Sequence, residues 1–405
     1  MKFNKRILII AYACESDKGS EPAVGWNWTK MLAKLFKEVY VITRENNVDS
    51  IKNGLVKENI NNVKIIKYDL PQGMLILKKK LRITRLYYYL WQIGAVNKIK
   101  KMRLKLDIIQ HVTFVNDYIP SMFYKLKCDK FVWGPIGSNE AIHNMFIKNN
   151  KHKLLDRIKH VSKYIQRKVD FNFNLCIKRS NYIIGTNNKV KGNLKINESK
   201  FSCIPAIGIE SLDNKHKTMC NDIKRIMFIG NLVPIKNPYL ALEAFLKFNS
   251  INTKSEFWIL GDGPELNRMK VLSERYNKID NVKFLGKVNR DEVIKRMREA
   301  DVVLFPTLES AGFVTLESMA VGTPVISLDI GGPAQYTPKD LQVILNKCET
   351  LNDVSNDIVN KINDVVSNYE HYSKECINRV KLYTWDEKEK QIEQIYKNLL
   401  GENDV

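Results

Sequence analysis

The chain has 405 residues, long enough for two domains of ordinary size, and its 44% hydrophobic and 10% aromatic content can fill their cores. It contains no run of about 18 or more apolar residues, so we expect no membrane-spanning helix. The seven cysteines stand singly, without CxxC or Cys/His ligand spacing. Neither a disulfide framework nor a zinc site is therefore indicated, and a reducing cytoplasm is the expected location.

The formal net charge of +21 is concentrated in the first half of the chain. Residues 1–200 contain 39 Lys and Arg against 15 Asp and Glu, whereas residues 201–405 contain 26 against 29. Two segments hold most of the excess: residues 78–105 have ten basic residues, no acid, three consecutive tyrosines and a tryptophan, and residues 148–168 have eight basic residues with one acid. Such segments suit an anionic membrane face, with the aromatic rings at headgroup level. Nucleic acid and a merely solvated lysine-rich face are the alternatives.

Short apolar runs alternate with helical stretches through both halves. The opening MKFNKRILIIAYAC has an apolar stretch of only about seven residues before the charged CESDKGSE, which favours a buried strand over a signal peptide. In the first half, strands are expected at Ile7–Ala13, Val39–Arg44, Val63–Leu70, Asp107–Val112, Lys130–Ile136 and Asn181–Thr186, before an apolar run at Phe201–Ile207. In the second half, they are expected at Arg225–Gly230, Glu256–Gly261, Val282–Lys287, Asp301–Pro306, Pro324–Asp329 and Val343–Asn346.

This pattern predicts an α/β protein with two doubly wound, Rossmann-like domains, because continuous apolar strands between helices are typical of parallel sheets. We expect an N-terminal domain over 1–207, a linker over 208–222, a second domain over 223–384, and a C-terminal helix over 385–405 that packs across both. Ligands of such sheets bind at the carboxyl ends of the strands, so the interdomain cleft is the expected site.

Two features of the first half would lie at that edge. KGSEPAVGWNW places Gly19 and Ser20 between the first strand and a helix that starts near Pro22, although it is not the GxGxxG dinucleotide fingerprint. His111 ends the strand Asp107–Val112 and either points into the cleft or is a hydrogen-bonded core histidine.

In the second half, Lys236 follows the strand Arg225–Gly230 by six residues, in a turn. A lysine there can reach a diphosphate as a point charge, although an exposed loop lysine is the commoner outcome. GDGPE, with Gly261 and Gly263, is a tight turn that either allows close approach of a nucleotide or simply connects a strand to a helix.

The most informative stretch is DVVLFPTLESAGFVTLESMAVGTPVISLDIGGP, residues 301–333. It predicts a strand, a loop with Glu309, a helix that opens near Gly312–Thr315 and carries Glu317, and a second strand. The first N–H groups of a helix lack intrahelical partners and attract anions, while carboxylates accept hydrogen bonds from sugar hydroxyls. Two solvated glutamates would show the same spacing, but the surrounding strands and turns suit a ligand with a diphosphate between two hydroxylated rings, such as a nucleotide sugar.

Together these residues resemble the large retaining GT-B glycosyltransferase family with the Glu-x7-Glu motif, which includes many bacterial polysaccharide and mannosyl transferases. The resemblance covers nearly the whole chain and is most specific over 225–333, at FIGNLVPIKNP, WILGDGPE, VKFLG and FPTLESAGFVTLESMAVGTPVISLDIGGP. It implies a GT-B fold with an interdomain cleft, a nucleotide-diphosphate-sugar donor in the second domain (a UDP-sugar first, a GDP-sugar next), an acceptor on the first domain, and transfer with retention. It also implies that neither a metal nor a cofactor is needed.

The resemblance assigns roles by position. Glu309 would bind hydroxyls of the donor sugar, Lys236 the diphosphate, and Glu317 the ribose hydroxyls. His111 would face the reacting sugar. The remaining donor-binding residues would be Gly19, Asn231, Gly261, Gly263, Gly312, Phe313, Val314 and Thr315. Asn231 departs from the family, which usually has Arg there, so the diphosphate would depend more on Lys236 and the helix N-terminus.

The resulting hypothesis is a metal-independent hexosyltransferase that acts on a saccharide, lipid-linked acceptor in capsular or exopolysaccharide synthesis. It would be peripheral on the inner face of the plasma membrane, held there by its basic N-terminal domain, and would bind no nucleic acid. A nucleic-acid-binding protein is the alternative from another class. A sugar-nucleotide epimerase of the same fold class is the other, and it would form product without an acceptor.

Overall fold

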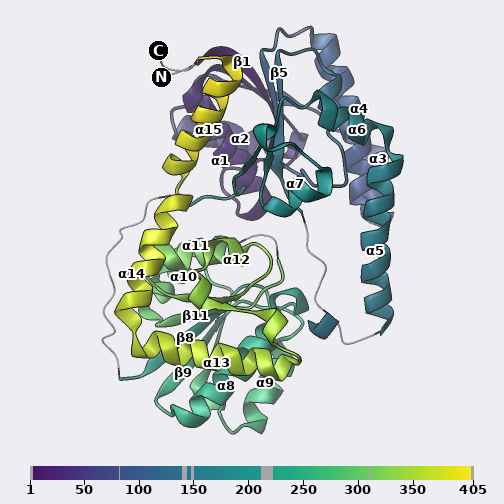
Figure 1. Ribbon diagram of the computed structural model, residues 1–405. Coiled ribbons are helices and arrows are strands. Elements are labelled where there is room, and N and C mark those ends of the chain that lie inside the picture. Colours follow the sequence, from purple (N-terminus) through teal and green to yellow (C-terminus); the bar gives the residue numbers. More distant parts are fainter. Residues whose placement is uncertain are drawn as a thin grey trace. The chain divides into compact units, whose positions relative to one another are not determined.

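The computed structural model describes residues 3–81, 83–138, 144–146, 150–210, 222–309 and 312–402, and these form two compact units (Figure 1). The first unit contains the described residues up to 138, those in 157–206 and those from 389 onward. The second contains the described residues in 139–156 and in 207–388. Each unit is built on one parallel sheet, so each is considered by itself.

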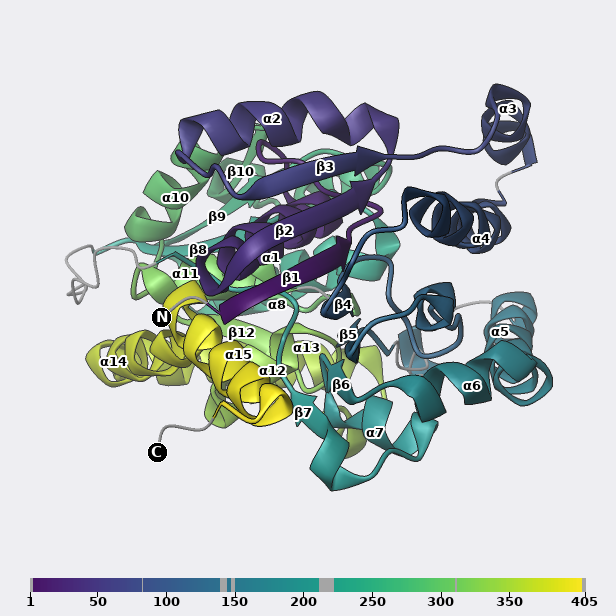
Figure 2. The ribbon, with the colours of Figure 1, turned by 90° about the horizontal axis from the view of Figure 1, so that it is seen from above.

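The first unit has a seven-stranded sheet in the order β3-β2-β1-β4-β5-β6-β7, and Figure 2 shows most of these strands side by side. All neighbouring strands are parallel. The strands are β1 (Phe3–Ile10), β2 (Phe36–Thr43), β3 (Val63–Lys67), β4 (Ile108–His111), β5 (Lys130–Ile136), β6 (Tyr182–Gly185) and β7 (Phe201–Cys203). From β1 the strand order runs to one edge of the sheet through β2 and β3, and from β4 it runs to the other edge. The switch point therefore lies between β1 and β4, and sheets of this kind bind ligands at such a point.

Helices connect these strands. They are α1 (Ser20–Leu35), α2 (Val48–Lys57), α3 (Gln72–Leu81), α4 (Thr84–Met102), α6 (Phe171–Arg179) and α7 (Asn188–Leu194), and α5 (Asn150–Val169) continues into this unit at Arg157. Side chains cap two of them: Asp170 accepts a hydrogen bond from the Asn172 amide at the start of α6, and Asn187 accepts one from the Val190 amide at α7.

Three of the four aromatic residues of the basic segment 78–105 lie in the core of this unit, and the fourth, Tyr89, is half-buried against it. Tyr87, Tyr88 and Trp91 of α4 are at most 2% exposed. Tyr12, next to β1, packs edge-on against Tyr88 and Trp91. The expectation that these rings reach a membrane headgroup region is therefore wrong for these three, because helix α4 turns them toward the sheet.

The second unit has a six-stranded sheet in the order β10-β9-β8-β11-β12-β13, again with all neighbours parallel. The strands are β8 (Lys224–Ile229), β9 (Ser255–Leu260), β10 (Val282–Gly286), β11 (Val302–Phe305), β12 (Val325–Leu328) and β13 (Gln342–Val343). Its switch point lies between β8 and β11. The helices are α8 (Pro238–Ile251), α9 (Leu266–Arg275), α10 (Arg290–Glu299), α11 (Phe313–Ala320), α12 (Pro333–Tyr336), α13 (Leu351–Ser367) and α14 (Tyr369–Val380).

The C-terminal segment forms helix α15 (Trp385–Leu400). Its first four residues belong to the second unit, and from Glu389 onward it belongs to the first. There Tyr396 packs edge-on against Phe36, and its hydroxyl donates to the Gln110 side chain at 2.6 Å. This buried contact attaches the end of the chain to the first sheet.

The structure confirms the predicted fold class, with every expected strand present to within a few residues. The predicted domain limits stay a prediction; in the structure, the long central change from the first unit to the second falls between residues 206 and 207. Within the described ranges, no helix is both long and apolar enough to cross a bilayer.

Candidate functional site

Loops from neighbouring strands of the second unit converge at the carboxyl ends of β8 and β11. The β8–α8 loop contains the short 3-10 turn Pro234–Lys236, and the β11–α11 loop contains Glu309. The Leu308 amide donates to the Ile235 carbonyl at 2.9 Å, and the Asn237 side-chain amide donates to the Pro306 carbonyl at 2.8 Å. These bonds hold the two loops against each other, so a side chain of one can meet a side chain of the other.

Lys236 and Glu309 form an ion pair across these loops. The Lys236 Nζ atom lies 3.2 Å from Glu309 Oε2, and the two side chains are 16% and 31% exposed. The lysine side chain passes close to Gly230, because a Cβ on that residue would lie only 3.0 Å from Lys236 Nζ. The absence of a side chain at Gly230 therefore leaves space for the lysine. The structure thus brings together the residues predicted to bind the diphosphate and the donor sugar.

Helix α11 starts four residues after Glu309, with Gly312 at its N-cap and Phe313, Val314 and Thr315 in its first turn. A Cβ on Gly312 would lie 2.6 Å from the Tyr336 ring, which explains the glycine. Thr315 is fully buried, and its hydroxyl has no hydrogen-bond partner among the described residues. The first amides of the helix lack intrahelical partners, so this turn offers several donors.

The loop after β12 braces Glu309 from the other side. The Gly332 amide donates to the Glu309 carbonyl at 2.9 Å. Gly331 has a φ of 74°, and a Cβ there would lie 2.5 Å from that carbonyl oxygen. A glycine at 331 is therefore required for the backbone of the Glu309 loop to lie where it does.

Glu317 lies one turn further along α11 and pairs with Arg290, the first residue of α10. Glu317 Oε1 is 3.0 Å from Arg290 Nη2 and 3.1 Å from its Nε. Burial raises the pKa of Glu317 above its usual value, and the Arg290 guanidinium opposes the shift. The sequence did not reveal Arg290, because the contact depends on how α10 and α11 pack.

The glycines of GDGPE have a structural role in this unit. Gly261 has a φ of 145°, and a Cβ there would lie 1.9 Å from the Gly230 carbonyl oxygen; one on Gly263 would lie 2.5 Å from that of Leu232. Between the same two loops, the Leu232 amide donates to the Asp262 carbonyl at 2.9 Å. Close packing of protein backbone therefore accounts for both glycines without a ligand, and their donor-binding role stays a prediction. Asn231, in the same β8–α8 loop, is exposed.

In the first unit, His111 ends β4 and is 1% exposed. Its Nε2 lies 2.7 Å from the Tyr88 hydroxyl, and its Nδ1 lies 2.7 Å from Ser121 Oγ. Burial lowers the pKa of His111 to about 3. The sequence left two alternatives for His111, a side chain that points into the cleft or a hydrogen-bonded core histidine, and the structure shows the second. A role at the reacting sugar stays a prediction, and it requires the ring to give up one of these partners.

Gly19 is the N-cap of α1, and no described atom lies within 4 Å of the position of an added Cβ. Next to it, the carboxylate of Glu21 accepts a hydrogen bond from the Phe114 amide at 2.6 Å. Burial raises the pKa of Glu21, and both Ser20 and Phe114 have a φ of 60°. A half-buried carboxylate next to two residues with positive φ, at the sheet edge, is the kind of feature found at functional sites. Sequence reasoning did not single out Glu21.

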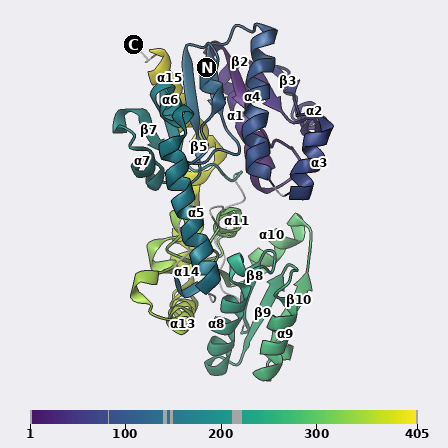
Figure 3. The same cartoon turned by 90° about the vertical axis from the view of Figure 1, so that its right-hand side faces the viewer.

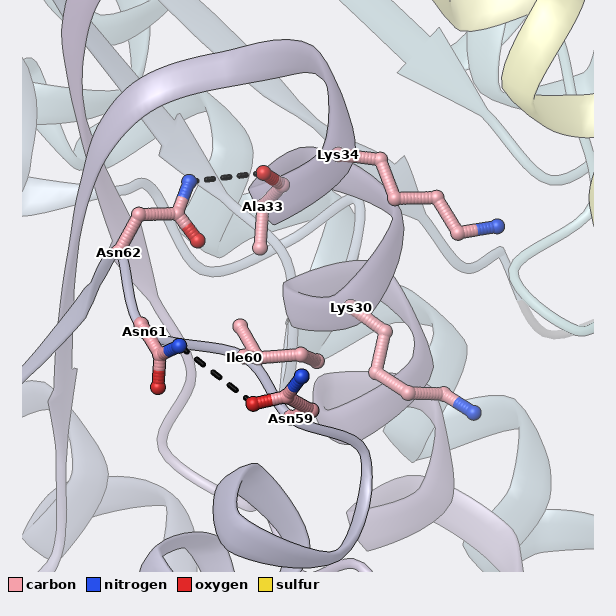
Figure 4. Close-up of a pocket in the computed structure, with 7 residues that line it drawn as sticks. All are labelled: Lys30, Ala33, Lys34, Asn59, Ile60, Asn61 and Asn62. Carbon is pink, nitrogen blue, oxygen red and sulfur yellow. Dashed lines mark hydrogen bonds between the residues drawn. The ribbon is translucent and has the colours of Figure 1, made fainter.

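Two pockets lie away from the predicted residues. One of about 470 Å³ lies in the first unit, between the end of α1 and the turn before β3, and is lined by Lys30, Ala33, Lys34 and Asn59 to Asn62 (Figure 4). It opens where β3 begins, opposite the carboxyl ends of the strands, and Asn62 there donates to the Ala33 carbonyl at 2.8 Å. The other, of similar volume, shares Pro234 and Asn237 with the β8–α8 loop, but neither Lys236 nor Glu309 lines it. Among the described residues, no group of three His, Cys, Asp or Glu is placed to hold a metal ion.

Comparison with known proteins shows that the chain is similar to glycosyltransferases. Residues 213–382 match the family model described as glycosyl transferases group 1. The chain is similar to D-inositol 3-phosphate glycosyltransferase of Acidothermus cellulolyticus, with 33% identity over 117 residues that cover 26% of each chain. It is also similar to a component of the phosphatidylinositol N-acetylglucosaminyltransferase of Arabidopsis thaliana, with 27% identity over 182 residues, 44% of this chain and 39% of the relative. The chain thus matches well under half the length of these curated relatives.

Solved structures match over nearly the whole chain. An Anabaena protein, HepE, in complex with UDP and glucose has a TM-score of 0.60 at 14% identity and covers 98% of this chain and 100% of its own. Sucrose-phosphate synthase from Thermosynechococcus elongatus has a TM-score of 0.63 at 16% identity and covers 99% and 100%. The fold is therefore that of the GT-B glycosyltransferases. Within that fold, the second unit carries the segment similar to the group 1 enzymes.

Proposed function

We propose that the protein is a retaining, metal-independent glycosyltransferase that moves a sugar from a nucleotide-diphosphate sugar to a saccharide acceptor. The observation that carries the proposal is the Lys236–Glu309 ion pair beside the first turn of α11. A cation, free helix amides and a carboxylate within one small region match the parts of such a donor. The match of residues 213–382 to group 1 glycosyl transferases supports this choice.

Each group has a task in the reaction. The bond between the anomeric carbon and the diphosphate oxygen breaks with both electrons leaving on the diphosphate, a new bond forms to an acceptor hydroxyl oxygen, and the proton of that hydroxyl passes to the departing diphosphate. Negative charge grows on the leaving diphosphate, where Lys236 and the α11 amides would stabilise it. Glu309 would accept hydrogen bonds from the donor sugar and orient it, and Glu317 would do the same for the ribose.

The donor and acceptor classes belong to the proposal as well. A UDP-sugar is the first candidate, since similar structures were solved with UDP or UDP-glucose, and a GDP-sugar is the next. The acceptor would be a lipid-linked saccharide of capsular or exopolysaccharide synthesis, met at the inner face of the plasma membrane. The net charge of the first 200 residues supports a location at an anionic surface.

A donor screen followed by a transfer assay tests the activity. Thermal unfolding is followed with UDP-, GDP-, dTDP- and ADP-sugars, because a ligand at about 100 times its Kd adds about 2.7 kcal/mol of stability. The best donor is then incubated with and without saccharide acceptors while nucleoside diphosphate release is measured. Release that depends on acceptor supports transfer, whereas conversion of the donor without acceptor identifies the epimerase alternative.

Glu309→Ala is the matching variant. It removes a partly exposed carboxylate without removing core packing, so the fold should survive while transfer is lost. Near-normal kcat/KM with the same donor would contradict the site assignment. Glu349→Ala, an exposed change in the same unit, is the control and should leave transfer unchanged.

A further inference from the structure

Helix α5 carries an apolar stripe that faces away from the protein. The stripe consists of Ile158, Val161, Ile165 and Val169, all in the part of α5 that belongs to the first unit. At the helical repeat of about 100° per residue, these positions fall within an arc of about 80°. Each is between 52% and 76% exposed. A contiguous stripe of this kind marks an interaction surface, because water is a poor solvent for it.

The polar side of α5 attaches the helix to the first unit. Arg167 Nη1 lies 3.0 Å from Asp117 Oδ2, a carboxylate in a residue that is 3% exposed. One turn earlier, Lys163 lies over the Tyr118 ring at 5.0 Å. A surface helix usually packs its apolar face inward and its polar face outward. In α5 the polar side contacts the first unit and the apolar side is exposed. Packing of the helix against its own unit therefore does not account for the exposed stripe.

A second group of exposed apolar side chains belongs to helices α3 and α4 of the same unit. Ile76, Leu77 and Leu81 of α3 and Leu86 of α4 are 39% to 61% exposed. Arg85 of α4 lies over the same Tyr118 ring that Lys163 contacts, at 5.0 Å. Figures 2 and 3 show α3, α4 and α5 along one side of the first unit. We call the α5 stripe together with these four residues the α3–α5 face.

The charge around the face selects its partner. Residues 150–169 contain seven Lys or Arg and one acid, and Arg157 and Lys168, both exposed, border the α5 stripe by helical position. Two copies of this face would bring like charges together, which disfavours a homodimer. An anionic bilayer complements it: the apolar side chains enter the acyl boundary and the basic ones stay at the phosphates.

We propose that the α3–α5 face docks the protein on an anionic lipid bilayer, with α5 lying in the interface. The inference rests on the membrane location in the proposed function and names the surface and the side chains responsible. Tyr87, Tyr88 and Trp91 of segment 78–105 play no part, because they are buried. The exposed aliphatic side chains of α3 and α5 take that role.

Co-sedimentation of the full chain with vesicles tests the proposal. One set contains equal parts phosphatidylglycerol and phosphatidylcholine, and the other contains phosphatidylcholine alone. The triple variant Ile158→Gln, Val161→Gln and Ile165→Gln should bind anionic vesicles at least about tenfold more weakly than the wild type. The matched control is Ile251→Gln, Val271→Gln and Ile279→Gln, three exposed apolar positions of the second unit, and it should bind like the wild type.

A charge variant separates the two contributions. Arg157→Gln with Lys168→Gln should weaken binding to anionic vesicles by several-fold, and added salt should remove most of that difference. Equal and poor binding of the wild type to both vesicle types overturns the proposal, as does unchanged binding of the triple variant. A wild type that is dimeric in light scattering without lipid, with a monomeric triple variant, also overturns it and makes the face a protein interface.

Two measurements keep these outcomes interpretable. Circular dichroism and thermal unfolding show that the variants fold, which the exposure of all substituted side chains leads us to expect. Transfer to a water-soluble acceptor should be the same for the triple variant and the wild type. Lost vesicle binding with intact transfer supports the docking face, whereas absent transfer with intact vesicle binding affects only the proposed activity.

Discussion

At the scale of single residues, the site is arranged so that its groups satisfy one another before a ligand arrives. Lys236 pairs with Glu309, and Arg290 pairs with Glu317. These pairs are partly exposed, so they add little to stability. Under the proposed function, a donor would exchange the Lys236–Glu309 contact for contacts from its diphosphate to the lysine and from its sugar hydroxyls to the carboxylate.

Lys236→Ala should therefore weaken the binding of UDP, or of whichever nucleoside diphosphate the screen identifies, by about 1–3 kcal/mol, the scale of a lost charge-assisted contact. Isothermal titration measures it, with Lys339→Ala, an exposed lysine of the same unit, as the control. Equal affinity of the Lys236 variant and the wild type would remove the lysine from the site.

His111 should make the stability of the first unit depend on pH. Its folded-state pKa is lowered from 6.5 to about 3 by burial, so the neutral ring contributes stability fully above pH 6.5. The contribution is lost as the pH falls from 6.5 toward 3, because the unfolded chain takes up the proton and the folded one does not.

Denaturant unfolding at pH 7 and pH 5 checks this for the wild type and for His111→Asn. The wild type should lose up to about 2 kcal/mol more than the variant between these two pH values. The difference between the two proteins cancels the other titrating groups. Parallel pH profiles for both proteins would mean that His111 titrates normally.

At the scale of elements, the second unit depends on close approach between loops. The β9–α9 turn and the β8–α8 loop touch through Gly261 and Gly230, and the second of these loops carries Lys236. The position of the lysine therefore depends on backbone packing between its own loop and the adjacent one. A change in GDGPE should act on the site through this contact, even if no ligand atom reaches those glycines.

Gly261→Ala should destabilise the second unit by more than about 2 kcal/mol, since it combines an unfavourable φ with a backbone clash. Gly192→Ala is the matched control: this glycine is inside helix α7, and an added Cβ meets no described atom within 4 Å. The control should be neutral or more stable by up to about 1 kcal/mol. Chemical denaturation compares both, and a Gly261 variant as stable as the wild type would refute the packing account.

At the scale of the whole molecule, the two units divide the proposed work. Under the proposed function, the first unit, which contains most of the excess basic residues, would meet the acceptor and the lipid surface, and the loops of the second unit would bind the nucleotide diphosphate. Hydrogen exchange of the full chain can separate these roles, because amides that bind a ligand are protected by it.

Saturation with the nucleoside diphosphate should slow exchange over residues 230–237 and 312–317. Anionic vesicles should instead slow exchange over α3 and α5. If Gly19 also touches the phosphates, residues 19–21 join the first set. Protection confined to the first unit when the nucleotide is added would contradict the placement of the donor.

The sequence by itself determined much of this protein. Apolar runs of strand length between helical stretches predicted both parallel sheets, since such runs are stable only when buried on two faces. The glutamates, the lysine and the glycine-rich turns could be picked out because their spacing follows the strand ends, and strand ends meet at one edge.

The tertiary structure decided which side chains pair and which are buried, and the spacing of residues in the sequence does not contain this information. It paired Lys236 with Glu309 and Arg290 with Glu317, buried His111 between two hydroxyls, and turned Tyr87, Tyr88 and Trp91 into the core. It also turned the apolar side of α5 outward. These outcomes depend on which face of a helix or strand meets its neighbours, and that follows from long-range packing and not from local sequence.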